Sequence, residues 1–385
     1  MRTGQLGGRS KDEGAIIRGE EQGLWRDVWH QLRRNRLAMS GLVIFLGFVI
    51  LALVGVFLTT GKSPLLDPSL VRLPEKLRPP LAKARADLLH PQELPPLGIY
   101  LMGTDELGRD VFSRMMQGAW VSLTVGFVAV GIAVGIGIVL GGIAGYYGAR
   151  PLRIGTILGL AGLFSGPFAL MSKKPDVFLL LEGTGILILL STTYLGRRRG
   201  FVARFFTLPC VSVDTLIMRA VDVMLCFPSF FLILTVVAIL PPSIYNIMAV
   251  IGLTSWMGTA RFVRAEFLSL REQDFVLAAK ALGLSDARII FRHLVPNAVA
   301  PVLVSATLGI AGAILTEAGL SFLGFGVPPP HATWGNILSD GKRFLFDAPW
   351  LTLIPGVAVL TVVLAFNLFG EGLREALNPR LRRSR

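Results

Sequence analysis

The stretch FVLAAKALGLSDARIIFRHLVPN, residues 275–297, lies between two long apolar runs and is built differently from both. The apolar residues of its first part fall on one side of a short helix: Phe275, Ala278, Ala279 and Leu282. Gly283 can adopt the left-handed conformation that ends such a helix. Ser285 can cap a second, basic helix through its hydroxyl, and Pro296 can stop that helix. The stretch therefore predicts two short helices that meet at an angle.

The composition indicates a membrane protein. Of the 385 residues, 52% are hydrophobic and 16% are charged, whereas soluble domains carry about a quarter charged residues. Several apolar runs approach or exceed the ~20 residues that a helix needs to cross a bilayer. Because a chain in lipid satisfies its backbone only in helices or closed barrels, we expect an all-α polytopic membrane protein. The expected spans are 38–60, 119–144, 154–171, 177–195, 216–240, 244–260, 298–325 and 350–369.

The basic residues suggest how these spans are oriented. The formal net charge is +13, and Lys and Arg crowd beside the apolar runs, as the positive-inside bias produces. This bias places both termini and the loop 261–297 in the cytoplasm. Lys173 and Lys174 would then lie outside, which cuts against this orientation. Membrane lipid is thus an expected partner and nucleic acid is not, because no folded basic module accompanies the charge.

Motifs for chemistry are missing from the sequence. GxxxxGK[ST], the loop that cradles ATP phosphates, does not occur. The histidines show no metal-ligand spacing, and no nucleophile and base can be paired. We expect no catalytic residue, no metal site and no cofactor bound directly.

The polar stretches set the predicted domain boundaries. We expect a cytoplasmic tail over 1–37, the first span over 38–60, an external Pro-rich loop over 61–117, a core over 118–373 and a basic cytoplasmic tail over 374–385. In the first tail, Trp25, Trp29 and Leu32 share one helical face, which favours a helix lying in the membrane interface. A frayed basic tail is the alternative.

Glycines recur four residues apart in the second span. Gly131 and Gly135 form one such pair, and Gly141 and Gly145 form another. Small residues at this spacing let helix backbones approach closely. We therefore expect the second span to pack tightly in a helical bundle.

The same sequence also resembles a known family. LAAKALG at 277–283, followed by Val295 and Pro296, resembles the loop with which ATP-binding-cassette importer permeases dock into their ATPase. Further stretches are similar to the dipeptide/oligopeptide branch, and specifically to the second of its two permease subunits. They are 24–44, 103–123, 218–229, 314–330, 334–336 and 348–356.

The resemblance implies a type I permease bundle in a bacterial cytoplasmic (inner) membrane. It implies an ATP-driven importer of dipeptides or oligopeptides, with this subunit forming half of the translocation path. The implied partners are a homologous permease in a heterodimer, two cytoplasmic ATPases that carry ATP and Mg, and an extracytoplasmic solute-binding protein. Import of nickel or another non-peptide solute is an alternative, and an ATP-independent channel or a membrane sensor is an alternative of a different class.

The resemblance also implies where the ATPase couples to this chain. Among the matching loop positions, the candidates for this coupling are Leu277, Ala278, Ala279, Gly283 and Pro296. Asp274 lies nearby and is a further candidate. Leu277 replaces the usual Glu, and Val295 stands where Leu is usual, so no Glu-dependent contact is assigned. From the residues alone, a helix pair resting on lipid headgroups is an equal alternative.

One segment departs from the family pattern. The family usually runs from a turn like GYYG (145–148) directly to a segment like VDTLIMRAVD (213–222). Here residues 149–212 intervene and contain two shorter apolar runs. We interpret them as an inserted membrane hairpin, which leaves the later topology unchanged. A re-entrant or peripheral hairpin is the alternative.

Ionisable and helix-breaking residues inside the expected spans are candidates for the translocation path. Glu317 lies deep in its run and can attract the amino end of a peptide or hydrogen-bond a neighbouring helix. Asp222 is three residues from Arg219, a spacing that favours a structural ion pair. Pro228 is expected to kink its helix, which can shape the path or serve packing.

The motif GTDELGRD, residues 103–110, lies in the external loop. Thr104 can cap a helix that begins at Asp105, and Arg109 can pair with Asp105 or Glu106 on that helix. Asp105, Arg109 and Asp110 are therefore candidates for docking the binding protein. A capped surface helix that only orients the second span is the alternative.

Overall fold

A computed structural model describes residues 26, 28–61, 64–148, 150–153, 184, 186–187 and 209–377. Four parts of the predictions lie outside the described residues: Trp25 of the expected interfacial helix, the expected span 154–171, the expected span 177–195 except residues 184, 186 and 187, and most of the tail 374–385. The chain forms two compact units. Unit 1 contains Met1–Ile136, Phe227–Thr259 and Pro296–Arg385, and unit 2 contains Gly137–Cys226 and Ala260–Val295.

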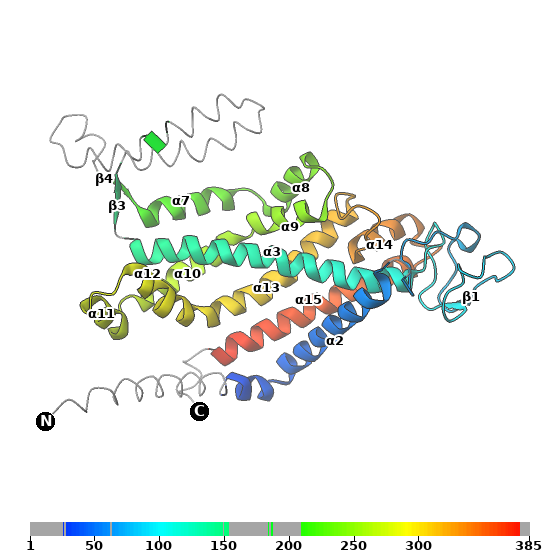
Figure 1. The fold of residues 1–385 in the computed structure, drawn as a ribbon, viewed down its shortest axis with the longest axis horizontal. Coiled ribbons are helices and arrows are strands. Elements are labelled where there is room, and N and C mark those ends of the chain that lie inside the picture. The colour runs from blue at the N-terminus through cyan, green and yellow to red at the C-terminus, as the bar shows by residue number, and fades with distance from the viewer. Residues whose placement is uncertain are drawn as a thin grey trace. The chain divides into compact units, whose positions relative to one another are not determined.

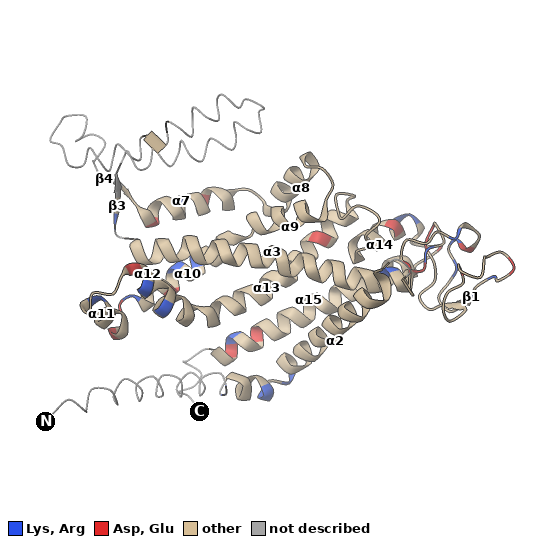
Figure 2. Cartoon of the chain, in the orientation of Figure 1, with Lys and Arg blue, Asp and Glu red and all other residues tan. Residues whose placement is uncertain are grey.

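Four helical segments in the described part of the chain are long and apolar enough to cross a membrane. They are α2 (Arg36–Thr59), α3 (Val111–Tyr147), the continuous path Asp286–Phe322 and α15 (Trp350–Leu377). Figure 2 shows that charges along α2, α3 and α15 are confined to the helix ends. The described chain is mostly helical, as the composition predicts, although it also contains four short strands.

Two of the expected spans are interrupted. Residues 216–240 form two helices, α7 (Val213–Cys226) and α8 (Ser229–Ile239). The two are long and apolar enough to cross a membrane only if they are taken together as one span, broken by a bend of 82°. Pro228 is the N-cap of α8, so it separates two helices rather than kinking one. Residues 244–260 form α9 (Ile244–Leu253) and the start of α10 (Trp256–Leu270). Thr254 ends α9, and its hydroxyl bonds back to the carbonyl of Val250 at 2.7 Å.

In unit 1, α2 and α15 lie side by side and antiparallel (Figure 1). The first residues of α2 meet the last turn of α15, where Asn35 Nδ2 donates to Glu375 Oε2 at 2.9 Å. Further along, the rings of Phe45 and Phe366 lie 4.8 Å apart. The chain therefore enters α2 and leaves α15 at the same end of this helix pair.

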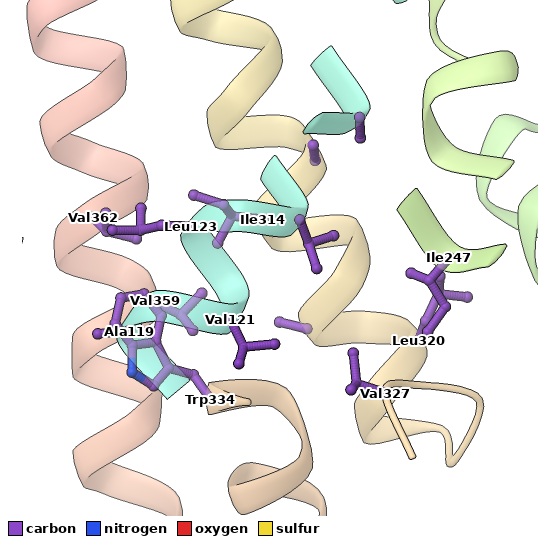
Figure 3. Packing of buried hydrophobic residues seen from close by; sticks show 14 of the residues in the cluster. Ala119, Val121, Leu123, Ile247, Ile314, Leu320, Val327, Trp334, Val359 and Val362 are labelled. Carbon is purple, nitrogen blue, oxygen red and sulfur yellow. The ribbon is translucent and has the colours of Figure 1, made fainter. Parts of the chain in front are cut away.

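The core of unit 1 gathers around Trp334, the first residue of α14 (Trp334–Gly341). Its side chain is fully buried, and its indole Nε1 donates to the carbonyl of Met115 at 3.3 Å. Thr333 and Asn336 form a capping box that starts α14 at this point. Figure 3 shows the surrounding apolar side chains of α3, α9, α13 (Val295–Phe322) and α15: Ala119, Val121, Leu123, Ile247, Ile314, Leu320, Val359 and Val362.

Residues 64–110 fold into a small layer with little regular structure. It contains the 3-10 turn η1 (Leu73–Glu75) and the antiparallel strands β1 (Ala82–Lys83) and β2 (Ile99–Tyr100). Tyr100 is fully buried within it. A second 3-10 turn, η3 (Lys342–Phe344), follows α14.

Unit 2 contains the last turns of α3, helices α7, α10, α11 (Asp274–Ala281) and α12 (Asp286–Ile289), and the π-helical turn η2 (Ile290–Leu294). Strand β3 (Pro151–Arg153) pairs antiparallel with β4 (Pro209–Ser212). Because these strands are neighbours, the segment between them starts and ends at the same place, which fits an insertion. The hairpin itself lies outside the described residues.

The glycine prediction is confirmed for one pair. A Cβ atom at Gly141 would lie 2.4 Å from the carbonyl oxygen of Ala260, and one at Gly145 would lie 2.6 Å from Cβ of Phe267. The backbones of α3 and α10 therefore touch at glycine. The prediction is wrong within this chain for Gly131 and Gly135, since a Cβ there would meet no described atom within 4 Å.

Candidate functional site

The two short helices predicted from residues 275–297 form a bent unit that we call the elbow: α11, the turn 282–285, α12 and η2. Gly283 has a φ of +75°, as the prediction requires. The N–H of Gly283 donates to the carbonyl of Lys280 at 3.0 Å, and that of Leu284 donates to Ala279 at 3.2 Å. These two bonds make a Schellman motif, so the glycine ends α11 by a defined geometry.

The first arm of the elbow exposes apolar side chains. Val276 and Ala279 are buried, whereas Phe275, Leu277 and Leu282 are 41%, 46% and 81% exposed. The expected apolar face is thus rotated, because Val276 and Ala279 pack inward and leave most of the predicted face open. Large exposed apolar residues on one short helix are typical of a surface that another molecule covers.

The second arm differs from the prediction at both ends. Ser285 is the N-cap of α12, but its hydroxyl makes no capping hydrogen bond. Pro296 does not stop the helix, which continues through η2 into α13 (Val295–Phe322). The N–H of Val295 donates to Ile290 five residues back. This π-turn places Pro296 in the first turn of α13, where a missing N–H is tolerated.

Charge is concentrated around the elbow. Figure 2 shows Lys and Arg residues on and beside α11 and α12.

In the same unit as the elbow, Asp222 on α7 pairs with Arg219 at 3.6 Å, as its spacing predicts, and also with Arg261 at 2.5 Å. Arg261 was not expected, since only the fold brings α10 beside α7. The carboxylate of Asp222 is thus neutralised by two cations at the surface.

Glu317 is fully buried in unit 1. Its carboxylate accepts hydrogen bonds from Ser321 Oγ at 2.7 Å and from Ser122 Oγ on α3 at 3.2 Å. Glu317 was expected either to attract the amino end of a peptide or to hydrogen-bond a neighbouring helix. The structure contains the second of these contacts, the hydrogen bond to α3. Ser122 was not identified from the sequence, because a serine in an apolar run carries no signal of its partner.

The motif at residues 103–110 does not begin a helix at Asp105, contrary to the prediction. Asp105 is buried and its Oδ1 accepts from the N–H groups of Leu107 and Arg109, both at 2.9 Å. These bonds hold the backbone in a turn, so the helix begins only at Val111. Asp110 caps it by accepting from the N–H of Ser113 at 3.1 Å.

The predicted pair of Arg109 and Asp105 is confirmed, at 2.6 Å, and belongs to a larger network. Arg114 Nη1 contacts Asp105 Oδ2 at 2.6 Å and Asp340 Oδ2 at 2.9 Å, and Arg109 also reaches Asp340 at 3.2 Å. The network ties the layer of residues 64–110 to α3 and α14. Asp340 is 226 positions from Arg114, and no sequence pattern links the two.

A cavity of about 490 Å³ opens beside this network. Its lining includes Glu106, Arg109, Asp340 and His331 together with the run Pro328–Pro330. Asp105 and Asp110 are buried and do not line it. Of the three candidate docking residues, only Arg109 reaches this open surface.

Known proteins resemble the chain along most of its length. Residues 200–383 match the family described as binding-protein-dependent transport system inner membrane component, and residues 23–79 match the N-terminal TM domain of oligopeptide transport permease C. The chain is 35% identical to the dipeptide transport system permease protein DppC of Alkalihalophilus pseudofirmus, over 93% of this chain and 90% of that protein. It is 29% identical to the oligopeptide transport system permease protein OppC of Bacillus subtilis, over 94% and 91%. It is 32% identical to DppC of Haemophilus influenzae, over 93% and 95%.

The helical fold, the apolar spans and these matches define a permease of a binding-protein-dependent transport system, which is a non-catalytic, multi-pass inner membrane component. Within that class, the chain belongs to the peptide transport permeases of the OppC/DppC type.

Proposed function

We propose that this chain forms half of the translocation path of an ATP-driven importer of dipeptides or oligopeptides, and that the elbow receives the movement of the ATPase. The exposed apolar side chains of Phe275 and Leu277 on α11 and of Leu282 directly after it are the observation that carries the coupling role. The names of the relatives support the peptide substrate. The fold is a type I permease bundle into which residues 149–212 insert a hydrophobic hairpin.

The proposed complex contains a homologous permease, two cytoplasmic ATPases and an extracytoplasmic solute-binding protein. ATP and Mg²⁺ belong to the ATPases, so this chain binds no cofactor directly. Both termini lie in the cytoplasm. The contact of Asn35 with Glu375 supports this topology, because it places the start of α2 and the end of α15 at one end of the helix pair.

The coupling residues have different roles in this proposal. Leu277 and Ala278 are exposed and contact the ATPase, with Asp274 at the start of α11. Ala279 is buried and supports the helix from behind. Gly283 sets the angle of the elbow. Pro296 lies in the first turn of α13, where the movement enters that helix.

The path and docking residues act mainly as supports. Glu317 and Asp222 are held by hydrogen bonds or ion pairs, and Pro228 separates α7 from α8 beside the path. At the external end, Asp105 and Asp110 shape the surface that Arg109 and the cavity rim offer to the binding protein.

The mechanism is alternating access. ATP binding closes the ATPases, which displace α11, and the continuous helix from Asp286 to Phe322 passes that displacement into the membrane. Hydrolysis then reopens the ATPases and returns the elbow. Peptide released by the binding protein enters the outward-open form and leaves from the inward-open form.

The proposal is tested with a photo-crosslinking amino acid at position 282, in the chain co-expressed with its partner subunits. The ATPase subunit is the expected crosslinked product. The same crosslinker at Tyr245, which is 77% exposed on α9, serves as the control. Absence of an ATPase adduct at Leu282 contradicts the coupling role, and uptake that persists without ATP favours a channel.

The substrate is tested separately. The binding protein is purified and its bound ligand is identified, and that ligand is then offered to the reconstituted complex. Stimulation of the ATPase by peptide-loaded binding protein is the expected result. Stimulation only by a nickel-loaded or otherwise non-peptide-loaded binding protein contradicts the peptide assignment.

A further inference from the structure

Both arms of the elbow meet the end of α3 through one side chain, Tyr146. Its hydroxyl donates a hydrogen bond of 2.7 Å to Oδ1 of Asp286, the first residue of α12. Its ring faces Lys280 on α11, with Nζ 5.4 Å from the ring centroid. Tyr146 is only 8% exposed. The Asp286 side chain is 37% exposed, so the bond is part-buried, and a hydrogen bond to a carboxylate is stronger where one side is kept from water.

The end of α3 is itself held in place, so Tyr146 projects from a fixed support. Arg271, which follows α10, donates through Nη1 to the carbonyl of Gly145 at 3.2 Å. The close approach of Gly145 to Phe267 adds backbone contact between α3 and α10. A side chain on this support can therefore resist a rotation of the elbow.

Two further side chains bond to Asp286. The Tyr147 hydroxyl hydrogen-bonds the carboxylate, and Arg150 Nη2 lies 3.0 Å from Asp286 Oδ2, but the Arg150 side chain is 64% exposed. Exposed ion pairs contribute little because water and salt screen them. Tyr146 is the most buried of the three partners, so its bond is the one best placed to fix the position of α12.

We propose that Tyr146 is a positioning residue that locks the elbow to the end of α3, so that displacement of α11 moves α3 together with α13. This inference rests on the proposed coupling role of the elbow. Helix α13 follows the elbow through the backbone, whereas among the residues that the structure describes α3 is joined to α12 by side chains. Without the Tyr146 bond, part of the ATPase movement is lost as rotation of the elbow.

The test uses the full complex with its ATPases in lipid and measures peptide imported per ATP hydrolysed. Tyr146→Phe removes the hydroxyl and keeps the ring beside Lys280. We expect its import per ATP to fall about 10-fold, the equilibrium factor for losing a hydrogen bond to a charged group. Assembly and basal ATPase activity are expected to stay at the wild-type level.

Matched variants isolate the bond. Asp286→Ala is expected to lower import per ATP as Tyr146→Phe does, and the double variant to be no worse than either one. Asp286→Asn keeps an oxygen acceptor for the tyrosine hydroxyl and is expected to retain most of the coupling. Arg150→Ala removes the exposed ion pair and the contact of the guanidinium with the Tyr147 ring, 4.5 Å from its centroid, and is expected to have little effect.

Two results overturn the inference alone while the crosslink from position 282 to the ATPase persists. One is an unchanged import per ATP in Tyr146→Phe. The other is an equal loss of assembly, ATPase activity and import, which indicates a purely structural role. Absence of that crosslink in the wild-type chain overturns the coupling function itself and this inference with it.

Discussion

Ser122 on α3 donates a hydrogen bond of 3.2 Å to Glu317 on α13, and both residues are fully buried. The carboxylate also accepts from Ser321, one turn further along its own helix. A buried carboxylate is costly unless it is hydrogen-bonded, and here both oxygens have a donor. The relationship connects two membrane helices in the middle of the unit 1 core.

Replacement of Glu317 distinguishes a structural bond from a contact with the substrate. Glu317→Gln keeps an acceptor for a serine hydroxyl, so we expect nearly normal stability and uptake. Glu317→Ala removes the carboxylate that accepts from the hydroxyls of Ser122 and Ser321 and is expected to cost about 1–3 kcal/mol. Thermal unfolding of the purified complex in detergent measures the difference. Loss of uptake in a stable Glu317→Gln variant would show that the charge acts on the peptide.

Substitution at Gly283 tests whether the angle of the elbow matters. The residue has a φ of +75°, and a Cβ there would meet no described atom within 4 Å, so the cost is that of the backbone conformation alone. We expect Gly283→Val and Gly283→Pro to abolish uptake with normal membrane insertion. Gly283→Asn is the control, since Asn tolerates the left-handed region and is expected to retain uptake. Full activity of a correctly inserted Gly283→Val chain would argue against a rigid elbow.

Breaking the charge network of Asp105, Arg109, Arg114 and Asp340 is expected to destabilise residues 64–110. Arg114→Ala leaves the buried Asp105 with one cation instead of two, and removal of one partner from a buried pair costs about 3–5 kcal/mol. Asp340→Asn is expected to be mild, because the Asp340 side chain is 29% exposed. Hydrogen exchange in residues 64–110 reports the change. Equal protection in the wild type and Arg114→Ala would show that the loop is held by other contacts.

The small layer formed by residues 64–110 is expected to lose stability in alkali through Tyr100. Burial raises the pKa of Tyr100 from 10.0 to about 12. Because the folded layer favours the neutral phenol, this contribution is fully present below pH 10 and is lost as the pH rises towards 12. Limited proteolysis of residues 64–110 between pH 9 and about 12 measures the loss.

Tyr100→Phe provides the control for this pH dependence. The phenol oxygen has no hydrogen-bond partner among the residues that the structure describes. We therefore expect the variant to fold normally and to be less sensitive to alkali than the wild type. The same alkaline loss in both proteins would assign it to other groups.

Local patterns in the sequence were sufficient for several features. The left-handed Gly283 and the pairs Arg219–Asp222 and Asp105–Arg109 were all predictable. Each depends on the conformational range of one residue or on side chains within a few positions. The apolar runs likewise predicted α2, α3, α13 and α15, because helix length and hydropathy are properties of a continuous segment.

Other local signals were outweighed by neighbouring bonds. Thr104 and Asp105 look like the start of a helix, but the Asp105 carboxylate bonds to the N–H groups of its own turn. Pro296 looks like a stop, but the π-turn before it removes the conflict. In both places two backbone conformations compete, and residue type alone does not rank their hydrogen-bond patterns.

The amino-acid sequence by itself determined that this chain crosses a membrane, bends at Gly283 and resembles a peptide permease. Only the tertiary structure decided that Ser122 meets Glu317, that Arg114 meets Asp340 and that Tyr146 meets Asp286, across 195, 226 and 140 positions. Periodicity specifies which face of a helix is apolar, but it does not specify which partner helix covers that face or at what height. Helix packing chooses those partners, because a buried polar group must find a donor or acceptor within about 3 Å in the assembled fold.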